Sequence, residues 1–200
     1  IVTTELLTDM ADYFKVECFE TLTGFKYIAE LLRKFEGEKT FIGGGEESYG
    51  YLAGDFVRDK DAVISTALIA EAAVWAGSQG KSFYELLIDI YIQFGFYKEA
   101  LVNMVKKGKE GEAAIAEIMN NFRNNPPAQI AGSDVVKIND FEESICTEPK
   151  KGKKSPIELP KSNVIQFFTE AGEKITVRPS GTEPKIKFYF GINAKTKDKA

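Results

Sequence analysis

The sequence predicts a partial three-layer α/β domain on a mixed or parallel sheet, followed by a small α+β domain. Up to Gly95 the chain alternates short β-branched or aromatic runs with amphipathic helical patterns, which is typical of α/β layers. After Gly95 one helical pattern stands among several strand-like runs and tight turns, which is typical of a small α+β domain. We therefore expect two domains, residues 1–95 and residues 96–200.

The first domain should begin with the end of a strand at residues 1–4 and a helix from Leu6 to Phe14. The stretch "KVECFETLTG" indicates a short strand and then a loop. A helix from Phe25 to Phe35 should follow, because its apolar residues recur on one face. "KTFIGGGEESYG" then indicates a short strand that runs into a glycine-rich loop.

Two strongly helical patterns close the first domain. In "DKDAVISTALIAEAAVWAGSQG" either Asp59 or Asp61 is placed to cap the helix, and the stripe around Trp75 is expected in the core. In "SFYELLIDIYIQFG" Ser82 is the expected N-cap, and Glu85 stands three residues later, as in a capping box.

The second domain should contain one helix and several strands. "YKEALVNMV" indicates a strand, and "KEGEAAIAEIMNNFRNN" an amphipathic helix that stops before two prolines. "SDVVKINDF" indicates another strand, and residues 147–162 a solvated hairpin or loop. "NVIQFFTEAGEKITVRP" and "KIKFYFGI" complete the β-rich part.

The composition argues against several classes of protein and several kinds of site. The chain has 200 residues with a formal net charge of −4, which argues against a broad nucleic-acid surface. No apolar run approaches the roughly 18 residues of a membrane span. Cys18 and Cys146 form no CxxC pair and no signal-like segment opens the chain, so a cytoplasmic location is expected. The lack of histidine removes the commonest metal ligand and the usual acid–base group near neutral pH, so no metal site is expected here.

The stretch "TVRPSGTEPKIKFYF" has the residue types of a clamp for one phosphate. An arginine fork, hydroxyl donors and a glycine that exposes backbone N–H groups all suit an anion. Lys185 or Lys187 would add a second positive charge. The alternative is a polar hairpin turn, because the same residues form turns. The candidate phosphate-binding residues are Arg178, Ser180, Gly181 and Thr182.

Three earlier stretches are also candidate sites. In "GGGEESYG" two carboxylates would repel phosphate but suit sugar hydroxyls, and the alternative is an acidic surface turn. In "DFVRDKDA" Arg58 and Lys60 could neutralise a phosphate, or Lys60 could move a proton; the alternative is a solvated charge run. "TLTGFK" places amides at a helix start where an anion could bind, and the alternative is an N-cap by Thr23.

In this order the stretches "TLTGFK", "GGGEESYGYLAGDFVRDKDA" and "VRPSGTEPKIKFY" resemble the α-D-phosphohexomutase family. Within it they resemble the phosphoglucomutase/phosphomannomutase enzymes, and the likeness extends over essentially the whole chain. The resemblance implies the latter part of the family's sugar-binding domain 3, followed by most of its phosphate-binding domain 4. That last domain would be α+β and similar to the TATA-box-binding protein. Both ends of the chain also suggest a piece of a larger protein.

The resemblance implies a role for each matching residue. Glu46 and Ser48 would hold sugar hydroxyls in a loop that Gly45 begins, and Lys60 would be a tentative catalytic residue with an acid–base or electrostatic role. The residues implied to bind substrate are Gly24, Phe25, Glu46, Ser48 and Arg58. The residues implied to bind phosphate are Arg178, Ser180, Gly181, Thr182 and Lys187.

Two motifs of the family do not occur in these 200 residues. One is the Thr-Ala-Ser-His type of phosphoserine motif, and the other is the Asp-Gly-Asp-Gly-Asp loop that binds Mg²⁺. The implied partners are a hexose phosphate and the N-terminal domains of the same protein, with no nucleic acid and no membrane. The Mg²⁺ ligands would lie outside this chain, so the chain alone should bind at most and not turn over. The alternative function is a non-catalytic module that binds a sugar phosphate.

Overall fold

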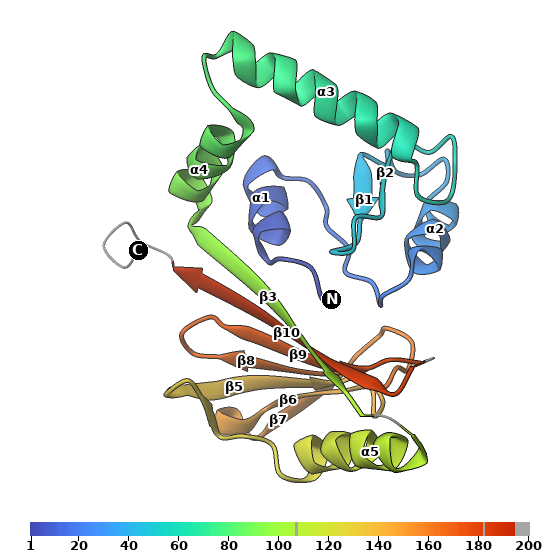
Figure 1. The fold of residues 1–200 in the computed structure, drawn as a ribbon, viewed down its shortest axis with the longest axis vertical. Coiled ribbons are helices and arrows are strands. Elements are labelled where there is room, and N and C mark those ends of the chain that lie inside the picture. Colours follow the sequence, from blue (N-terminus) through green and yellow to red (C-terminus); the bar gives the residue numbers. More distant parts are fainter. Residues whose placement is uncertain (107, 182, 195–200) are drawn as a thin grey trace. The chain divides into compact units, whose positions relative to one another are not determined.

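The structure, a computed structural model, describes residues 1–106, 108–181 and 183–194. The chain divides into two compact units, residues 1–96 (unit 1) and residues 97–193 (unit 2), which are described one at a time (Figure 1). Among the described residues, none of the helices combines the length and the apolar character that a membrane crossing needs.

Unit 1 consists of helices and a short hairpin. The elements are α1 (Leu6–Phe14), α2 (Phe25–Lys34), β1 (Gly43–Gly45), β2 (Tyr51–Ala53), α3 (Ala62–Ser78) and α4 (Phe83–Phe94). All four helices expected before Gly95 are present. The buried cluster joins α2 to β2 through Phe25, Ile28, Leu32 and Leu52, so the apolar face predicted for α2 packs on the hairpin.

Side chains at the helix starts explain where α3 and α4 begin. Asp61 caps α3, since its Oδ1 accepts the N–H groups of Val63 and Ile64 at 2.8 and 3.1 Å. The Ser82 and Glu85 capping box of α4 is confirmed: Glu85 N–H donates to Ser82 Oγ at 3.3 Å, and Ser82 N–H donates to Glu85 Oε2 at 2.7 Å.

The strand pairing in unit 1 differs from the expected parallel sheet. β1 and β2 pair antiparallel, and residues 1–4 and 15–20 lie outside helices and strands. The N-terminal amino group donates to the carbonyl oxygen of Thr21, the residue after the second segment, at 2.9 Å. The helices and the paired strands confirm the α/β class, whereas the predicted strands at residues 1–4 and 15–20 are wrong, because neither segment forms a ladder among the described residues.

Unit 2 is one sheet with a single helix. Its elements are β3 (Phe96–Val105, whose first residue belongs to unit 1), α5 (Lys109–Asn124), β4 (Gln129–Ile130), β5 (Ser133–Asp140), β6 (Ile145–Glu148), a 3₁₀ turn (Pro149–Lys151), β7 (Lys153–Pro156), β8 (Ile165–Thr169), β9 (Lys174–Pro179) and β10 (Lys185–Ala194). The strand order is β3-β10-β9-β8-β5-β6-β7, and β4 pairs with β5 at the side. Residues 147–162, predicted as a hairpin or loop, form most of the β6–β7 hairpin and the segment after it.

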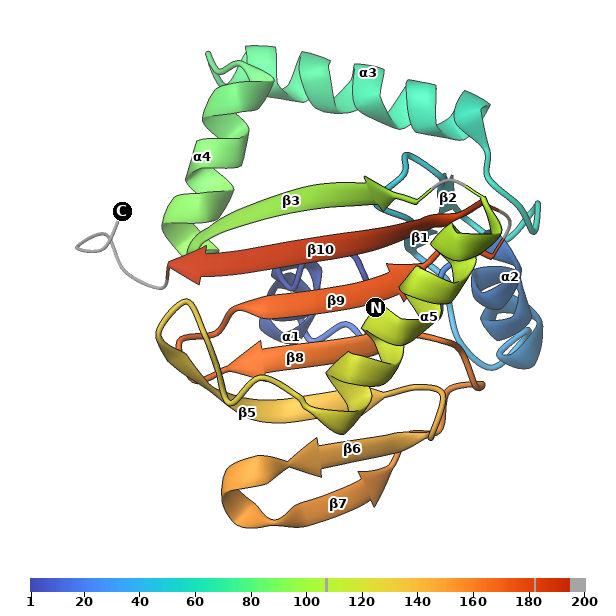
Figure 2. The same ribbon diagram turned by 60° about the horizontal axis from the view of Figure 1, so that its bottom comes forward.

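Helix α5 lies across one face of this sheet (Figure 2). Met119 of the helix packs in one cluster with Phe167 of β8 and Val177 of β9, all three almost completely buried. Side chains alternate between the faces of a strand, so the neighbours of Val177 in the sequence, Thr176 and Arg178, belong to the opposite face. The core therefore determines which side chains of β9 and β10 face away from α5.

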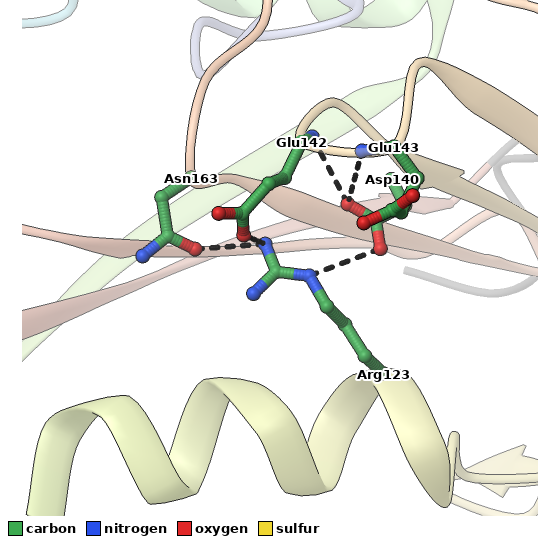
Figure 3. Close-up of polar contacts among 5 residues, drawn as sticks. All are labelled: Arg123, Asp140, Glu142, Glu143 and Asn163. Atoms are coloured by element: carbon green, nitrogen blue, oxygen red, sulfur yellow. Dashed lines mark hydrogen bonds and ion pairs between the residues drawn. The ribbon is translucent and has the colours of Figure 1, made fainter.

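Arg123 ties the last turn of α5 to the sheet (Figure 3). Its Nε lies 3.0 Å from Asp140 Oδ2, and its Nη2 lies 2.7 Å from both Glu142 Oε2 and Asn163 Oδ1. Asp140 in turn accepts the Glu142 N–H at 3.0 Å through Oδ1. The Arg123 and Asp140 side chains are only 14% and 15% exposed, so this pair is largely removed from solvent.

Replacing Arg123 by alanine should lower the free energy of unfolding by about 2–3 kcal/mol, because it leaves the largely buried Asp140 carboxylate without its cation. Urea denaturation followed by circular dichroism measures the effect. The control is Lys151→Ala, which removes an exposed ion pair with Glu148 and should leave the unfolding midpoint almost unchanged. Equal midpoints for Arg123→Ala and the wild type would contradict the role of Arg123 in joining α5 to the sheet.

Candidate functional site

The glycine-rich stretch of unit 1 is a tight hairpin. The Glu46 N–H donates to the Gly50 carbonyl oxygen at 2.8 Å, which closes the turn between β1 and β2. A Cβ would stand 2.6 Å from the Tyr51 hydroxyl oxygen at Gly43 and 2.9 Å from Tyr51 Cδ2 at Gly45, so a side chain at either position would displace the ring. The glycines thus let the Tyr51 ring lie across β1.

The Glu46 carboxylate reaches the start of α2. Its Oε1 accepts the Gly24 N–H at 2.8 Å, so it satisfies a backbone donor at the N-terminal end of the helix, where a negative charge is favourable. The N-cap of α2 is Gly24, with φ at 118°, and it makes no side-chain cap hydrogen bond. The alternative of a Thr23 N-cap is therefore wrong, and a residue of the hairpin takes that role.

Lys60 lies at the same place. Its Nζ stands 5.0 Å from the centre of the Phe25 ring and 3.1 Å from Asp59 Oδ1. The Lys60 backbone N–H also donates to that carboxylate at 2.7 Å, and this bond, followed by the ammonium group, lowers the pKa of Asp59. The structure therefore brings together Gly24, Phe25, Glu46 and Lys60, which come from three separate stretches of the sequence.

The two other candidates of unit 1 lie apart from this group of contacts. Arg58 forms an ion pair with Glu36, with Nη2 and Oε1 2.6 Å apart, and Ser48 is exposed in the turn. Arg58 and Glu46 both line a cavity of about 800 Å³ within unit 1. Most of its wall is apolar, with side chains such as Leu22, Ile28 and Phe41, whereas a hexose presents hydroxyls. We therefore assign only the hairpin end of the cavity to the candidate site.

In unit 2, two cations stand opposite each other on neighbouring strands. Arg178 of β9 is the register partner of Lys187 of β10, and both belong to the face away from α5. Like charges directly opposite on a sheet are destabilising, so an anion bound between the two cations would relieve the repulsion. The Arg178 Nη1 also lies 3.5 Å from the Tyr189 hydroxyl oxygen, two residues further along β10.

The loop beyond Arg178 is the hairpin turn between β9 and β10. Ser180 N–H donates to the Lys185 carbonyl oxygen at 2.8 Å, and Gly181 is exposed. Lys185 pairs with Glu183 and lowers the pKa of that carboxyl, and the charge of Lys187 lowers it further. The strand register places Lys187, rather than Lys185, directly opposite Arg178. Thr182 lies outside the described residues.

Among the side chains that the structure describes, no group of three or more His, Cys, Asp or Glu residues is arranged to hold a metal ion. No role in metal binding is therefore assigned to this part of the chain.

Comparison with known proteins agrees with the motifs. Residues 1–94 match the family described as phosphoglucomutase/phosphomannomutase, alpha/beta/alpha domain III, and residues 101–199 match its C-terminal domain. The chain belongs to the phosphoglucomutase/phosphomannomutase family. The two matched segments include every candidate residue named above, from Gly24 to Lys187.

Similar proteins carry the same family name. A phosphoglucomutase of Staphylococcus epidermidis (ATCC 35984) is 41% identical over 96% of this chain and 35% of its own length. A phosphoglucomutase of Staphylococcus aureus MRSA252 is 42% identical, again over 96% of this chain and 35% of its own length. The chain thus spans about a third of the curated relatives that it matches.

A solved structure shares the fold. The exocytosis-sensitive phosphoprotein pp63/parafusin of Paramecium, also named a phosphoglucomutase, aligns with a TM-score of 0.67 at 19% identity. The alignment covers 99% of this chain and 33% of that one. At this identity the likeness concerns the fold alone.

Sequence reasoning missed two residues at these sites. Tyr189 follows Lys187 at a spacing of two, which places both on one strand face, so period-two alternation was a signal for it. Gly50 gave no signal beyond its place in a glycine-rich stretch, because its neighbours Glu46 and Lys60 meet only in the folded chain.

Replacing Lys187 by methionine should raise the stability of the chain by about 0.5 kcal/mol in phosphate-free buffer, because it removes the like-charge pair with Arg178. The same variant should lose most of the stabilisation that inorganic phosphate gives the wild type. Thermal unfolding with and without phosphate measures both effects.

The control is Lys154→Met on β7, where the register partner is Thr147 rather than a cation. It should keep the phosphate response of the wild type. An unchanged phosphate response in Lys187→Met would contradict an anion site at this strand pair.

Proposed function

We propose that the chain is the sugar- and phosphate-binding part of a phosphohexomutase, which interconverts hexose 1-phosphate and hexose 6-phosphate. The observation that carries the proposal is the cation pair Arg178–Lys187 in the matched C-terminal domain, together with the Glu46 hairpin in the matched domain III. The names of the relatives support the reaction class.

The proposed role of unit 2 is to hold the phosphate that is not reacting. Arg178 supplies a planar fork of donors, Lys187 a second charge and Ser180 a hydroxyl. Gly181 and Thr182 complete the loop in this proposal. A phosphate held in this way fixes the substrate in an orientation suited to reaction, which contributes a large part of the lowering of a barrier.

The proposed role of unit 1 is to recognise the sugar. Glu46 Oε1 accepts the Gly24 N–H, which orients the carboxylate so that Oε2 accepts a sugar hydroxyl in the complex. Ser48, exposed in the same turn, donates to or accepts from a second hydroxyl. Lys60 places a positive charge near Glu46, and Arg58, which lines the cavity, adds a second cation.

The proposed reaction uses a phosphoserine that this chain does not contain. The phosphoserine gives its phosphoryl group to one end of the hexose phosphate, and a bisphosphate forms. After the sugar has turned round, the other phosphate returns a phosphoryl group to the serine, so phosphorus and charge balance over the cycle. Mg²⁺, with ligands outside this chain, would neutralise charge on the transferred group. The chain alone is then expected to bind without turnover, and the cytoplasm stays a proposed location.

In the longer protein, Arg178→Ala should raise KM and lower kcat/KM by about 100-fold or more, because a bidentate contact to the distant phosphate is lost. Steady-state kinetics with glucose 1-phosphate measures the change. Lys153→Ala, an exposed lysine on the far strand β7 of the same sheet, is the matched control and should behave as the wild type. Wild-type kinetics for Arg178→Ala would refute the phosphate clamp.

A further inference from the structure

We propose that Gly50 and Phe25 are positioning residues that hold the Lys60 side chain beside the Glu46 carboxylate, so that the ammonium group and the carboxylate meet the same substrate. This inference rests on the proposed function, since it assigns a purpose to the approach of Glu46 and Lys60. Neither Gly50 nor the Phe25 ring is itself proposed to touch the reacting atoms.

Gly50 is the place where Glu46 and Lys60 meet. A Cβ built on Gly50 would stand 2.8 Å from Lys60 Cδ, 3.2 Å from Lys60 Cγ and 3.0 Å from Glu46 Oε2. Gly50 is buried, and its φ lies outside the left-handed region, so the requirement for glycine comes from space and not from backbone conformation. The missing side chain is therefore what lets the lysine stem and the carboxylate occupy the same corner.

Phe25 bounds the lysine at its other end. The ring is 95% buried in the cluster with Leu32 and Leu52, so it is a fixed surface, and the Lys60 Nζ lies 5.0 Å from its centre. A cation over an aromatic face is attracted by the ring quadrupole. Gly50 thus leaves room for the stem of Lys60, and the charged end lies over Phe25 and 3.1 Å from Asp59 Oδ1.

The backbone directly after Lys60 is also fixed. Asp61 N–H donates to the Tyr51 carbonyl oxygen at 2.9 Å, which joins this segment to β2 directly after Gly50. Asp61 then caps α3 through its side chain. Because the backbone is held on this side, a methyl group at Gly50 must displace the lysine side chain or the carboxylate, not the chain itself.

The spectroscopic test uses the 200-residue chain with its lysine amines labelled by ¹³C-methylation, and Lys60→Arg assigns the Lys60 signal. Ring current from Phe25 should place this signal upfield of the other lysines in the wild type. Gly50→Ala and Phe25→Leu should both move it to the ordinary lysine position, whereas Phe25→Tyr keeps the ring and should keep the shift.

Gly77→Ala is the matched control, since a Cβ at Gly77 meets nothing within 4 Å. It should leave the Lys60 signal in place. An ordinary position for Lys60 in the wild type, or a Gly50→Ala signal that stays upfield, would overturn the positioning role. Circular dichroism of each variant shows whether it is folded, and Phe25→Leu, which removes the ring current, assigns the shift to Phe25.

The kinetic test uses the longer protein and a double-mutant cycle. Gly50→Ala should lower kcat/KM about tenfold in the wild-type background and less than about threefold in Lys60→Ala, because the methyl group then has no lysine stem to displace. Equal losses in the two backgrounds would overturn the inference. Wild-type kinetics for Lys60→Ala itself would instead remove the proposed role of Lys60, and the ring-current result would still show whether the side chain is held in place.

Discussion

The hydrogen bond from the Gly24 amide to the Glu46 carboxylate, 2.8 Å long, is the constraint on which the first candidate site depends. It joins the start of α2 to the turn between β1 and β2, two segments that are 22 residues apart. The same contact stabilises a helix end and orients a candidate binding group. A backbone donor at a helix end gains an acceptor, and a carboxylate gains a fixed direction. With the hairpin anchored in this way, Gly50 and then Lys60 fall beside Glu46.

In unit 2 the register of two neighbouring strands brings the candidate binding residues together. The core between α5 and the sheet buries Val177 and Ile186, and strand alternation then places Arg178 and Lys187 together on the other face. This arrangement conflicts with the rule that opposite charges should pair across strands. Such a local conflict, in a sheet whose packing is otherwise consistent, is typical of a functional position. Arg123 is the contrasting case, since its guanidinium group forms ion pairs with two carboxylates and needs no ligand.

Most of what could be predicted from the sequence depends on patterns among residues that are close together in the chain. The helices and the Ser82 cap depend on residues within one or two turns and were predicted correctly, and Asp61 is one of the two caps that were predicted for α3. The expected strands at residues 1–4 and 15–20 failed because strand formation depends on a partner rather than on propensity. The cap of α2 came from Glu46, a contact that no local pattern contains. Trp75 was expected in the core but is 57% exposed, and among the described residues Ala76 is the one residue of α3 that is buried. The candidate sites were predicted because the order of the motifs identified the family. The contacts of Gly50 and Tyr189 became visible only in the folded structure.

The most direct test of the central claim is an amide chemical-shift titration of the labelled 200-residue chain, first with inorganic phosphate and then with glucose 1-phosphate. The account predicts that inorganic phosphate shifts only the amides around Arg178, Ser180 and Lys187. Glucose 1-phosphate should shift these and, in addition, the amides of Gly24, Glu46 and Ser48, even where binding is weak. Shifts confined to other surfaces, or the same set of shifted amides with both ligands, would contradict separate loops for the phosphate and the sugar.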